Sequence, residues 1–222
     1  MCGRFALIVD ASVLADVFDV DPPRELKPRF NIAPTQTIPI VRSGLKTKRE
    51  CAMVRWGLIP SWAKDKKIGA RMINARGETV AEKPSFRSAV KNRRCLVPAD
   101  GFYEWVRTAE GKQPHFIHFL DGRPFAFAGL WERWEKGEGE PLETCTIITT
   151  TPNELIEDLH NRMPVILPSD RYDEWLEPEP LTGERIQGLL APHPSGGMEA
   201  YPVSTYVNKP INNGPECIVR VG

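Results

Sequence analysis

The 222-residue sequence lacks a long hydrophobic run, an excess of charge of one sign and a close pair of cysteines. No window approaches the roughly 20 apolar residues of a membrane-spanning helix, so a membrane protein is not expected. Lys and Arg total 29, as do Asp and Glu, which gives a formal net charge of +0. Bulk positive charge is therefore excluded as a means of binding nucleic acid, and any such binding requires a local basic patch.

The cysteines show neither a disulfide framework nor a zinc-binding pattern. They are Cys2, Cys51, Cys95, Cys145 and Cys217. Their odd number and wide spacing favour reduced thiols. All except Cys2 lie in apolar, strand-like runs, where Cys packs as a small hydrophobic residue. His115 and His118 are three residues apart, so on a strand they point to opposite faces. We expect no metal and no other cofactor.

Short elements joined by turns are expected, because the chain contains 17 Gly and 21 Pro. It has no internal repeat, low-complexity segment or long polar linker, which predicts a single domain over residues 1–222. Its start lacks the basic-then-apolar pattern of a secretory signal, so a cytoplasmic protein is expected. β-Branched and aromatic runs predict strands at Thr37–Arg42, Cys51–Gly57, Arg94–Pro98, Phe102–Val106, His115–Leu120, Phe125–Trp131, Thr144–Thr150, Val165–Leu167 and Ile218–Val221.

Helices are predicted to be few and short. One follows a capping box at residues 151–154 and ends at His160. The others are expected at Val13–Phe18, at Pro84–Lys91 with Ser85 as the cap, at Ser169–Leu176 and at Thr182–Leu190. Asp121-Gly122 predicts a hairpin between its flanking strands, and Trp134–Glu140 reads as a solvated loop. Strands outnumber helices without βαβ alternation, which predicts an α+β fold with a predominantly antiparallel, barrel-like sheet and a few short flanking helices.

Cys2 can become a reactive N-terminal residue, because a small second residue normally permits removal of Met1. The α-amine, with a pKa of about 7.7–8.0, and the thiol, with a pKa of about 8.5, would then sit on adjacent carbons. An aldehyde condenses with such an amine, and the thiolate then closes a five-membered thiazolidine ring. Ring closure is intramolecular and therefore fast.

Seven motifs in order connect Cys2 to polar residues that local structure does not explain. They are Met1-Cys2-Gly3-Arg4, Arg29–Pro34, Arg55–Pro60, Asn74–Thr79, Gly101–Trp105, His160–Pro164, and Pro202–Ser204 with Val207-Asn208. Together they resemble the SOS response-associated peptidase (SRAP) family, the abasic-site processing proteins, over nearly the whole chain. The resemblance implies an SRAP-like fold and covalent capture of abasic sites in single-stranded DNA through Cys2. It also implies self-processing to remove Met1, lyase-type activity at the lesion, and shielding of the lesion during the DNA damage response.

The same resemblance implies four catalytic residues: Cys2, Asn74, Glu104 and His160. Cys2 would supply the amine and thiolate, and Glu104 would orient the amine and shuttle protons. His160, with an ordinary pKa of about 6.5, would be the general acid that opens the closed sugar. Asn74 would hold Cys2 or the sugar by hydrogen bonds. Asn161 departs from the Asp that many relatives carry after the His, which would lower the pKa of His160.

DNA binding is expected to be local and independent of base sequence. The contact residues that the resemblance implies are Arg4, Asn31, Trp62 and Arg76, and Arg162 is expected to extend the basic surface. Trp62 would stack beside the abasic gap, and base stacking tolerates any sequence. The expected partner is single-stranded DNA containing abasic sites, bound by a monomer that associates with the nucleoid during damage if the source is bacterial.

Two other functions fit the residues. A thiol protease acting on proteins could use Cys2, Glu104 and His160 as nucleophile and base. Cys2→Ser keeps an oxygen nucleophile for hydrolysis but should abolish a stable thiazolidine. A non-catalytic nucleic-acid-binding module predicts that Cys2→Ala keeps full function, and it leaves the terminal cysteine without a purpose.

Overall fold

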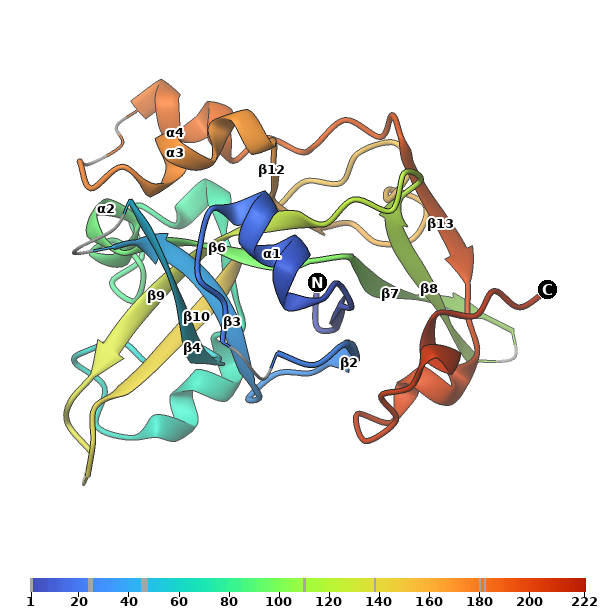
Figure 1. Cartoon of the computed structure of the whole chain (residues 1–222), viewed down its shortest axis with the longest axis horizontal. Helices are drawn as coiled ribbons and strands as arrows, with labels where there is room; N and C mark the ends of the chain where they lie inside the picture. The colour runs from blue at the N-terminus through green and yellow to red at the C-terminus, as the bar shows by residue number, and fades with distance from the viewer. Residues whose placement is uncertain are drawn as a thin grey trace.

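Two β-sheets, one of five strands and one of eight, form the framework of the computed structural model (Figure 1). It describes residues 2–23, 26–44, 48–109, 111–137, 139–179, 181 and 183–222. The strands are β1 (Phe5–Leu7), β2 (Arg29–Ile32), β3 (Thr37–Ser43), β4 (Arg49–Trp56), β5 (Asn74–Arg76), β6 (Arg94–Ala99), β7 (Gly101–Thr108), β8 (Gly111–Phe119), β9 (Phe125–Trp134), β10 (Leu142–Thr150), β11 (Met163–Pro164), β12 (Ile166–Leu167) and β13 (Met198–Pro202).

Five strands of the larger sheet close into a barrel in the order β10-β4-β3-β6-β9, because β9 also pairs with β10. The neighbouring pairs around the ring are antiparallel except β4–β10, in which Arg55 lies opposite Thr144 in a parallel register. β5 adds a second parallel pair on β10, with Asn74 opposite Ile147. The predicted α+β fold with a predominantly antiparallel, barrel-like sheet is confirmed.

The second sheet has the order β13-β8-β7-β1-β2 and carries the N-terminal strand. Only Asp100 separates β6 of the barrel from β7 of this sheet, and its carboxylate accepts the backbone N–H groups of Ile8 and Val9. The chain returns to the barrel through a turn at Gly122, whose N–H donates to the carbonyl of Phe119 (3.0 Å). The predicted hairpin at Asp121-Gly122 is therefore wrong: β8 pairs with β7 and β13, whereas β9 pairs with β6, β10 and β12.

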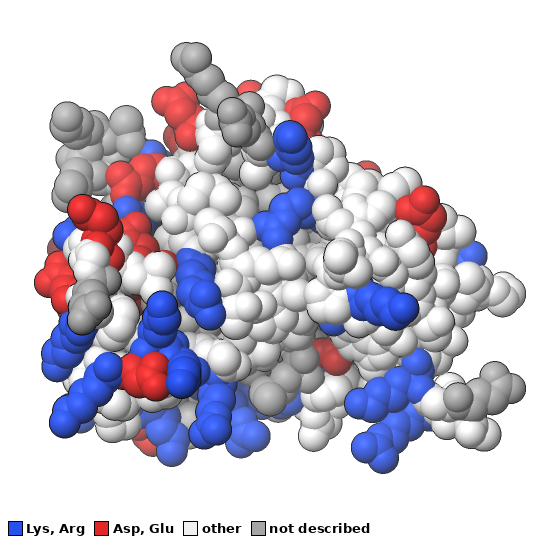
Figure 2. Space-filling view, turned by 90° about the horizontal axis from the view of Figure 1, so that it is seen from below, with Lys and Arg blue, Asp and Glu red and all other residues white. Residues whose placement is uncertain are grey.

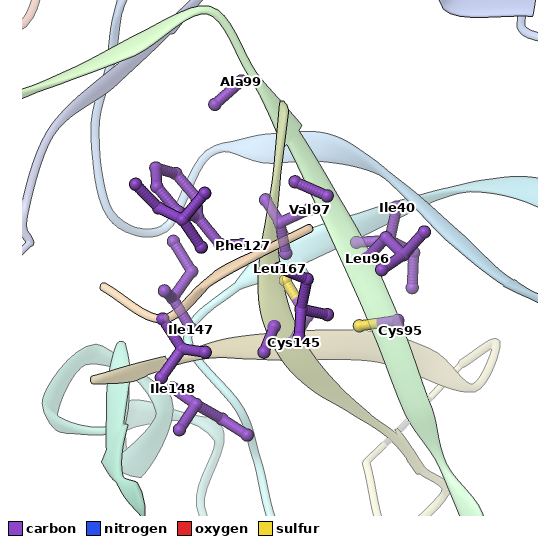
Figure 3. Packing of buried hydrophobic residues seen from close by; sticks show 14 of the residues in the cluster. Ile40, Cys95, Leu96, Val97, Ala99, Phe127, Cys145, Ile147, Ile148 and Leu167 are labelled. Carbon is purple, nitrogen blue, oxygen red and sulfur yellow. The ribbon is translucent and has the colours of Figure 1, made fainter. Parts of the chain in front are cut away.

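The barrel interior is filled by apolar side chains. Figure 3 shows side chains of β6, β9 and β10 packed together, with Cys95 and Cys145 among them. Both cysteines are fully buried, and burial raises the pKa of each thiol. All five cysteines are free thiols. Cys95 and Cys145 pack as small hydrophobic residues in strands, as predicted from their apolar runs.

Short helices flank the sheets: α1 (Ala11–Phe18), α2 (Ala89–Asn92), α3 (Tyr172–Leu176) and α4 (Gly183–Leu189). The 3₁₀ helices are η1 (Lys66–Arg71), η2 (Gly77–Thr79), η3 (Ser169–Arg171), η4 (Thr205–Asn208) and η5 (Pro215–Ile218). The side chain of Asp10 caps α1 by accepting the N–H groups of Ser12 and Val13. Among the described residues, no helix has the length and apolar character needed to cross a membrane.

Three predicted elements differ from the structure. The segment before His160 forms hydrogen-bonded turns rather than a helix, and Asn153, not Thr151, caps it by accepting the N–H of Ile156 (3.1 Å). The helix expected at Pro84–Lys91 is confined to α2, with turns before it. The strand expected at Ile218–Val221 is replaced by the end of η5 and a single bridge between Val203 and Arg220. Thr182, the expected start of the helix that is observed as α4, lies outside the described residues.

Candidate active site

Cys2 lies just before β1, beside strand β7. β1 runs antiparallel to β7 with Phe5 opposite Phe102, and the N–H of Tyr103 donates to the carbonyl of Arg4 (3.0 Å). Continuing this register brings the start of the chain alongside Glu104. The Cys2 thiol is fully buried and donates a weak hydrogen bond to the Arg4 carbonyl (3.9 Å). Burial raises the pKa of the Cys2 thiol, and the negative charge of Glu104 raises it further, so the thiol is protonated at neutral pH.

Glu104 is a buried carboxyl on β7, with 3% of its surface exposed. It is therefore not a solvated strand residue. Burial raises its pKa, because the charged form loses its hydration. A carboxyl with a raised pKa holds its proton closer to neutral pH than an exposed one does, and it can both give and accept a proton there.

The aromatic pair Phe5 and Trp56 connects strand β1 to the residue before Asn74. The two rings meet edge to face with centroids 5.3 Å apart, and the Trp56 indole N–H donates to the carbonyl of Ile73 (2.9 Å). The Asn74 amide N–H is at 3.5 Å from the carbonyl of Ile147. Its Oδ1 is buried and accepts no hydrogen bond from any residue that the structure describes. This oxygen is an acceptor available to a bound hydroxyl or amine.

His160 ends the run of turns that begins at Asn153, and its own N–H donates to the carbonyl of Ile156 (2.8 Å). Its Nδ1 accepts the backbone N–H of Arg162 (3.0 Å), so the neutral ring carries its proton on Nε2. Partial burial lowers the pKa of His160. Burial is the first cause of this shift, and the expected effect of Asn161 in place of Asp stays a prediction.

Strand β10 brings the Asn74 and His160 segments to one end of the barrel. Thr149 of β10 lies opposite Arg76 of β5 on one side and Pro164 of β11 on the other. The Arg162 guanidinium donates to the carbonyl of the same Thr149 (2.6 Å). The two polar segments are therefore neighbours across one strand end, although 86 positions separate Asn74 from His160 in the sequence.

The predicted DNA-contact residues fall into two groups. Arg76 is exposed, and Trp62 has 51% of its surface exposed, so both can meet a ligand. Arg162 instead forms an ion pair with Glu78 as well as its bond to Thr149. The amide of Asn31, a residue with 2% exposure, donates to the carbonyls of Val207 (3.0 Å), Lys209 (3.1 Å) and Asn212 (2.7 Å). The buried amide of Asn31 offers no surface to a phosphate, so we withdraw its assignment as a DNA contact.

Arg4 joins the N-terminal strand to the C-terminal segment, a link that sequence reasoning missed. Its guanidinium donates to Asn31 Oδ1 (2.7 Å) and to the carbonyl of Val207 (2.9 Å), and lies 5.7 Å from the centre of the Trp105 ring. The Trp105 indole N–H donates to Asn208 Oδ1 (2.7 Å). The C-terminal residues therefore hold in place the segment before β1 that carries Cys2. In the part of the chain that the structure describes, no group of three His, Cys, Asp or Glu residues is placed to hold a metal.

Comparisons with known proteins match nearly the whole chain. A family model described as SOS response associated peptidase (SRAP) matches residues 1–210. The abasic site processing protein YoqW of Bacillus subtilis (strain 168) is 50% identical over 98% of this chain and 99% of its own length. The abasic site processing protein HMCES of Gallus gallus is 33% identical over 88% of this chain and 67% of its own length. A crystal structure of a protein from Bacteroides thetaiotaomicron superposes with a TM-score of 0.89 at 31% identity, covering 99% of this chain and 100% of that one.

Proposed function

Because the chain belongs to the SOS response associated peptidase (SRAP) family, we propose that it processes abasic sites in single-stranded DNA and captures them covalently through Cys2. Residues 1–222 act as one domain and as a monomer, without a cofactor. The relatives named as abasic site processing proteins support the substrate. The observation that carries the mechanism is the burial of the Cys2 thiol within the electrostatic reach of Glu104.

The reaction begins with hydrolysis of the Met1–Cys2 peptide bond, which releases methionine and frees the Cys2 α-amine. We assign this step to the chain itself, in keeping with the peptidase in the family description. The amine then adds to the C1′ aldehyde of the open abasic sugar and forms a carbinolamine. Loss of water gives an iminium ion, and sulfur attack on its carbon closes the thiazolidine. The net change is amine, thiol and aldehyde to thiazolidine and water.

Glu104 transfers the protons in two steps, the loss of water from the carbinolamine and the closure of the ring by sulfur. In its protonated form it gives a proton to the departing hydroxyl, and the resulting carboxylate takes the proton of the Cys2 thiol as sulfur attacks. The carboxyl ends the cycle as it began. Its raised pKa suits this double use, since proton transfer is most efficient when the pKa of the group is near the working pH. The iminium also acidifies the C2′ hydrogen, so lyase-type strand cleavage competes with ring closure.

His160 and Asn74 act on the sugar. The protonated imidazole of His160 donates a proton to the ring oxygen of the closed sugar as the ring opens. Asn74 Oδ1 accepts a hydrogen bond from the sugar hydroxyl or the Cys2 amine. Arg76 contacts a neighbouring phosphate, and the exposed face of Trp62 stacks on a base beside the gap.

A thiol protease acting on other proteins is less well supported. Such an enzyme needs a thiolate beside an imidazolium, with a lowered thiol pKa. Here the pKa of the Cys2 thiol is raised, and among the described residues the thiol donates to the Arg4 carbonyl rather than to His160.

The proposal is tested by mixing the purified protein with single-stranded DNA containing one abasic site and resolving the products on a denaturing gel. Wild-type protein should give a covalent band that Cys2→Ser and Cys2→Ala lose, since neither variant can form a thiazolidine. The matched control, Cys217→Ala, should keep the band, because Cys217 is a free thiol in η5. A band that persists in Cys2→Ala would refute the mechanism, and an equal yield with double-stranded DNA would refute the preference for single strands.

A further inference from the structure

An exposed cluster of positive charge, which we call the cationic arm, is not explained by the residues assigned so far. It consists of Lys64, Lys66, Lys67 and Arg71, with Lys136 from the β9–β10 hairpin beside it. None of the five forms an ion pair with any residue in the described ranges. Figure 2 shows Lys and Arg side chains gathered at the lower left of this face of the molecule. Unpaired like charges repel one another, so their grouping indicates an anionic partner.

The cationic arm is mounted rigidly on the barrel. Gly57 and Gly69 touch so closely that a Cβ on Gly69 would lie 2.5 Å from the Gly57 carbonyl oxygen. Beneath the exposed cations, Ile68 packs against the small cluster of Ile59, Ala63 and Trp134. The Trp134 indole N–H donates to the carbonyl of Ala63 (2.8 Å). The backbone is therefore fixed while the long cationic side chains face outward.

The one acidic residue inside the run does not neutralise it by an ion pair. Asp65 Oδ1 accepts the backbone N–H of Lys67 (2.8 Å) and so caps η1. At the other side of the arm, Lys136 Nζ donates to the backbone carbonyl of Trp62 (3.4 Å), which links the hairpin to the residue that carries the exposed indole. An exposed aromatic ring next to a row of cations is the arrangement that binds single strands without reading their sequence.

We propose that the cationic arm binds the sugar-phosphate backbone of the DNA strand that flanks the abasic site, beyond the base stacked on Trp62. This inference rests on the proposed function, which supplies the strand. A 3₁₀ segment rises about 2 Å per residue, so the run from Lys64 to Arg71 extends over roughly 14 Å. That length covers about two to four phosphates of a strand. The arm adds affinity for any strand and takes no part in the chemistry at Cys2.

The test compares two triple variants that remove the same number of charges. The first is Lys64→Gln/Lys66→Gln/Lys67→Gln in the arm. The control is Lys83→Gln/Arg87→Gln/Lys91→Gln, whose residues are also exposed and lie near α2. Figure 1 places α2 far from η1, which is the turquoise coil at the bottom of the molecule. Binding to an undamaged oligothymidylate is followed by fluorescence anisotropy over a series of salt concentrations.

Each lost phosphate contact should reduce the slope of log K against log salt by about 0.7, so the arm variant should lose about 2 from the slope while the control keeps it. Crosslinking to a short abasic oligonucleotide, too short to reach the arm, should proceed at the wild-type rate in both variants. An arm variant with the slope and affinity of the control would overturn the inference. Because the binding probe has no lesion, this result is independent of whether any crosslink forms, and absence of crosslinking in all three proteins would instead defeat the proposed function.

Discussion

Glu104→Gln tests the proton transfers at Cys2, because it keeps the size of the side chain and removes its ability to carry a proton. A positioned acid–base group contributes about 10²–10⁴-fold to a rate, which corresponds to roughly 3–5 kcal/mol of barrier. We therefore expect the rate of crosslinking to abasic single-stranded DNA to fall by that factor under single-turnover conditions, measured by gel.

The same substitution should stabilise the fold at neutral pH. Burial raises the pKa of Glu104 in the folded state, so the folded chain holds this proton more tightly than the unfolded chain does. Below the unfolded pKa, both states are protonated and the two proteins should have similar melting temperatures. As the pH rises through the folded pKa, the wild type loses stability and Glu104→Gln does not. The melting temperature of the variant should therefore exceed that of the wild type at pH 7.5 and match it near pH 4.

Glu78→Gln is the matched control, because the pKa of Glu78 is shifted in the opposite direction. The hydrogen bonds from Arg162 lower the pKa of Glu78, so its charged form stabilises the fold above its unfolded pKa and this contribution is lost as the pH falls. Glu78→Gln should then melt below the wild type at pH 7.5, with the difference closing in acid. Crosslinking by Glu104→Gln at the wild-type rate would refute the role of this carboxyl, and a melting difference that does not change with pH would refute the effect of its burial.

Three further predictions concern single residues. His160→Ala should slow crosslinking. Because the lowered pKa leaves few protonated rings at pH 8, the ratio of the wild-type rate to the variant rate should grow about tenfold when the pH falls from 8 to 7. An equal ratio at both pH values would refute the role of His160 as an acid. Asn31→Ala loses hydrogen bonds to three carbonyls and to Arg4, so it should lower the free energy of unfolding in urea by about 2–4 kcal/mol. Asn161→Ala, at an exposed position, should change it little. Equal stabilities of the two variants would contradict the link between Asn31 and the C-terminal segment. Trp62→Ala should weaken binding to undamaged single strands by about 1–3 kcal/mol, measured by anisotropy, with exposed Met53→Ala as the unaffected control.

The sequence predicted the long strands well because their signals are local. β3, β4, β6, β9 and β10 lie where β-branched and aromatic runs indicate them. The short strands β1, β2, β5, β11 and β13 were not predicted, because two to five residues carry too little pattern and pair only through tertiary neighbours. The turn at Asp121-Gly122 was identified, but its partner strands were not, since a turn motif does not specify which sheet the chain enters next.

The candidate site was harder to interpret than to locate. The positions of Cys2, Asn74, Glu104 and His160 came from motif resemblance, and no spacing rule could have placed the segments that carry Asn74 and His160 on either side of strand β10. A polar residue in a motif can form hydrogen bonds within the protein instead of contacting a ligand, as Asn31 does with the C-terminal carbonyls. The anchoring role of Trp134 was missed because its neighbours read as a Gly/Glu loop, whereas the indole itself is buried.

Intact mass spectrometry of the product formed with an abasic oligonucleotide gives the most direct test of covalent capture at Cys2. We predict a species with the mass of the chain without Met1, plus the oligonucleotide, less one water, and stable without a reducing agent, as a closed thiazolidine would be. A species that still contains Met1, or an adduct that appears only after borohydride reduction, would contradict the joint use of the Cys2 amine and thiol.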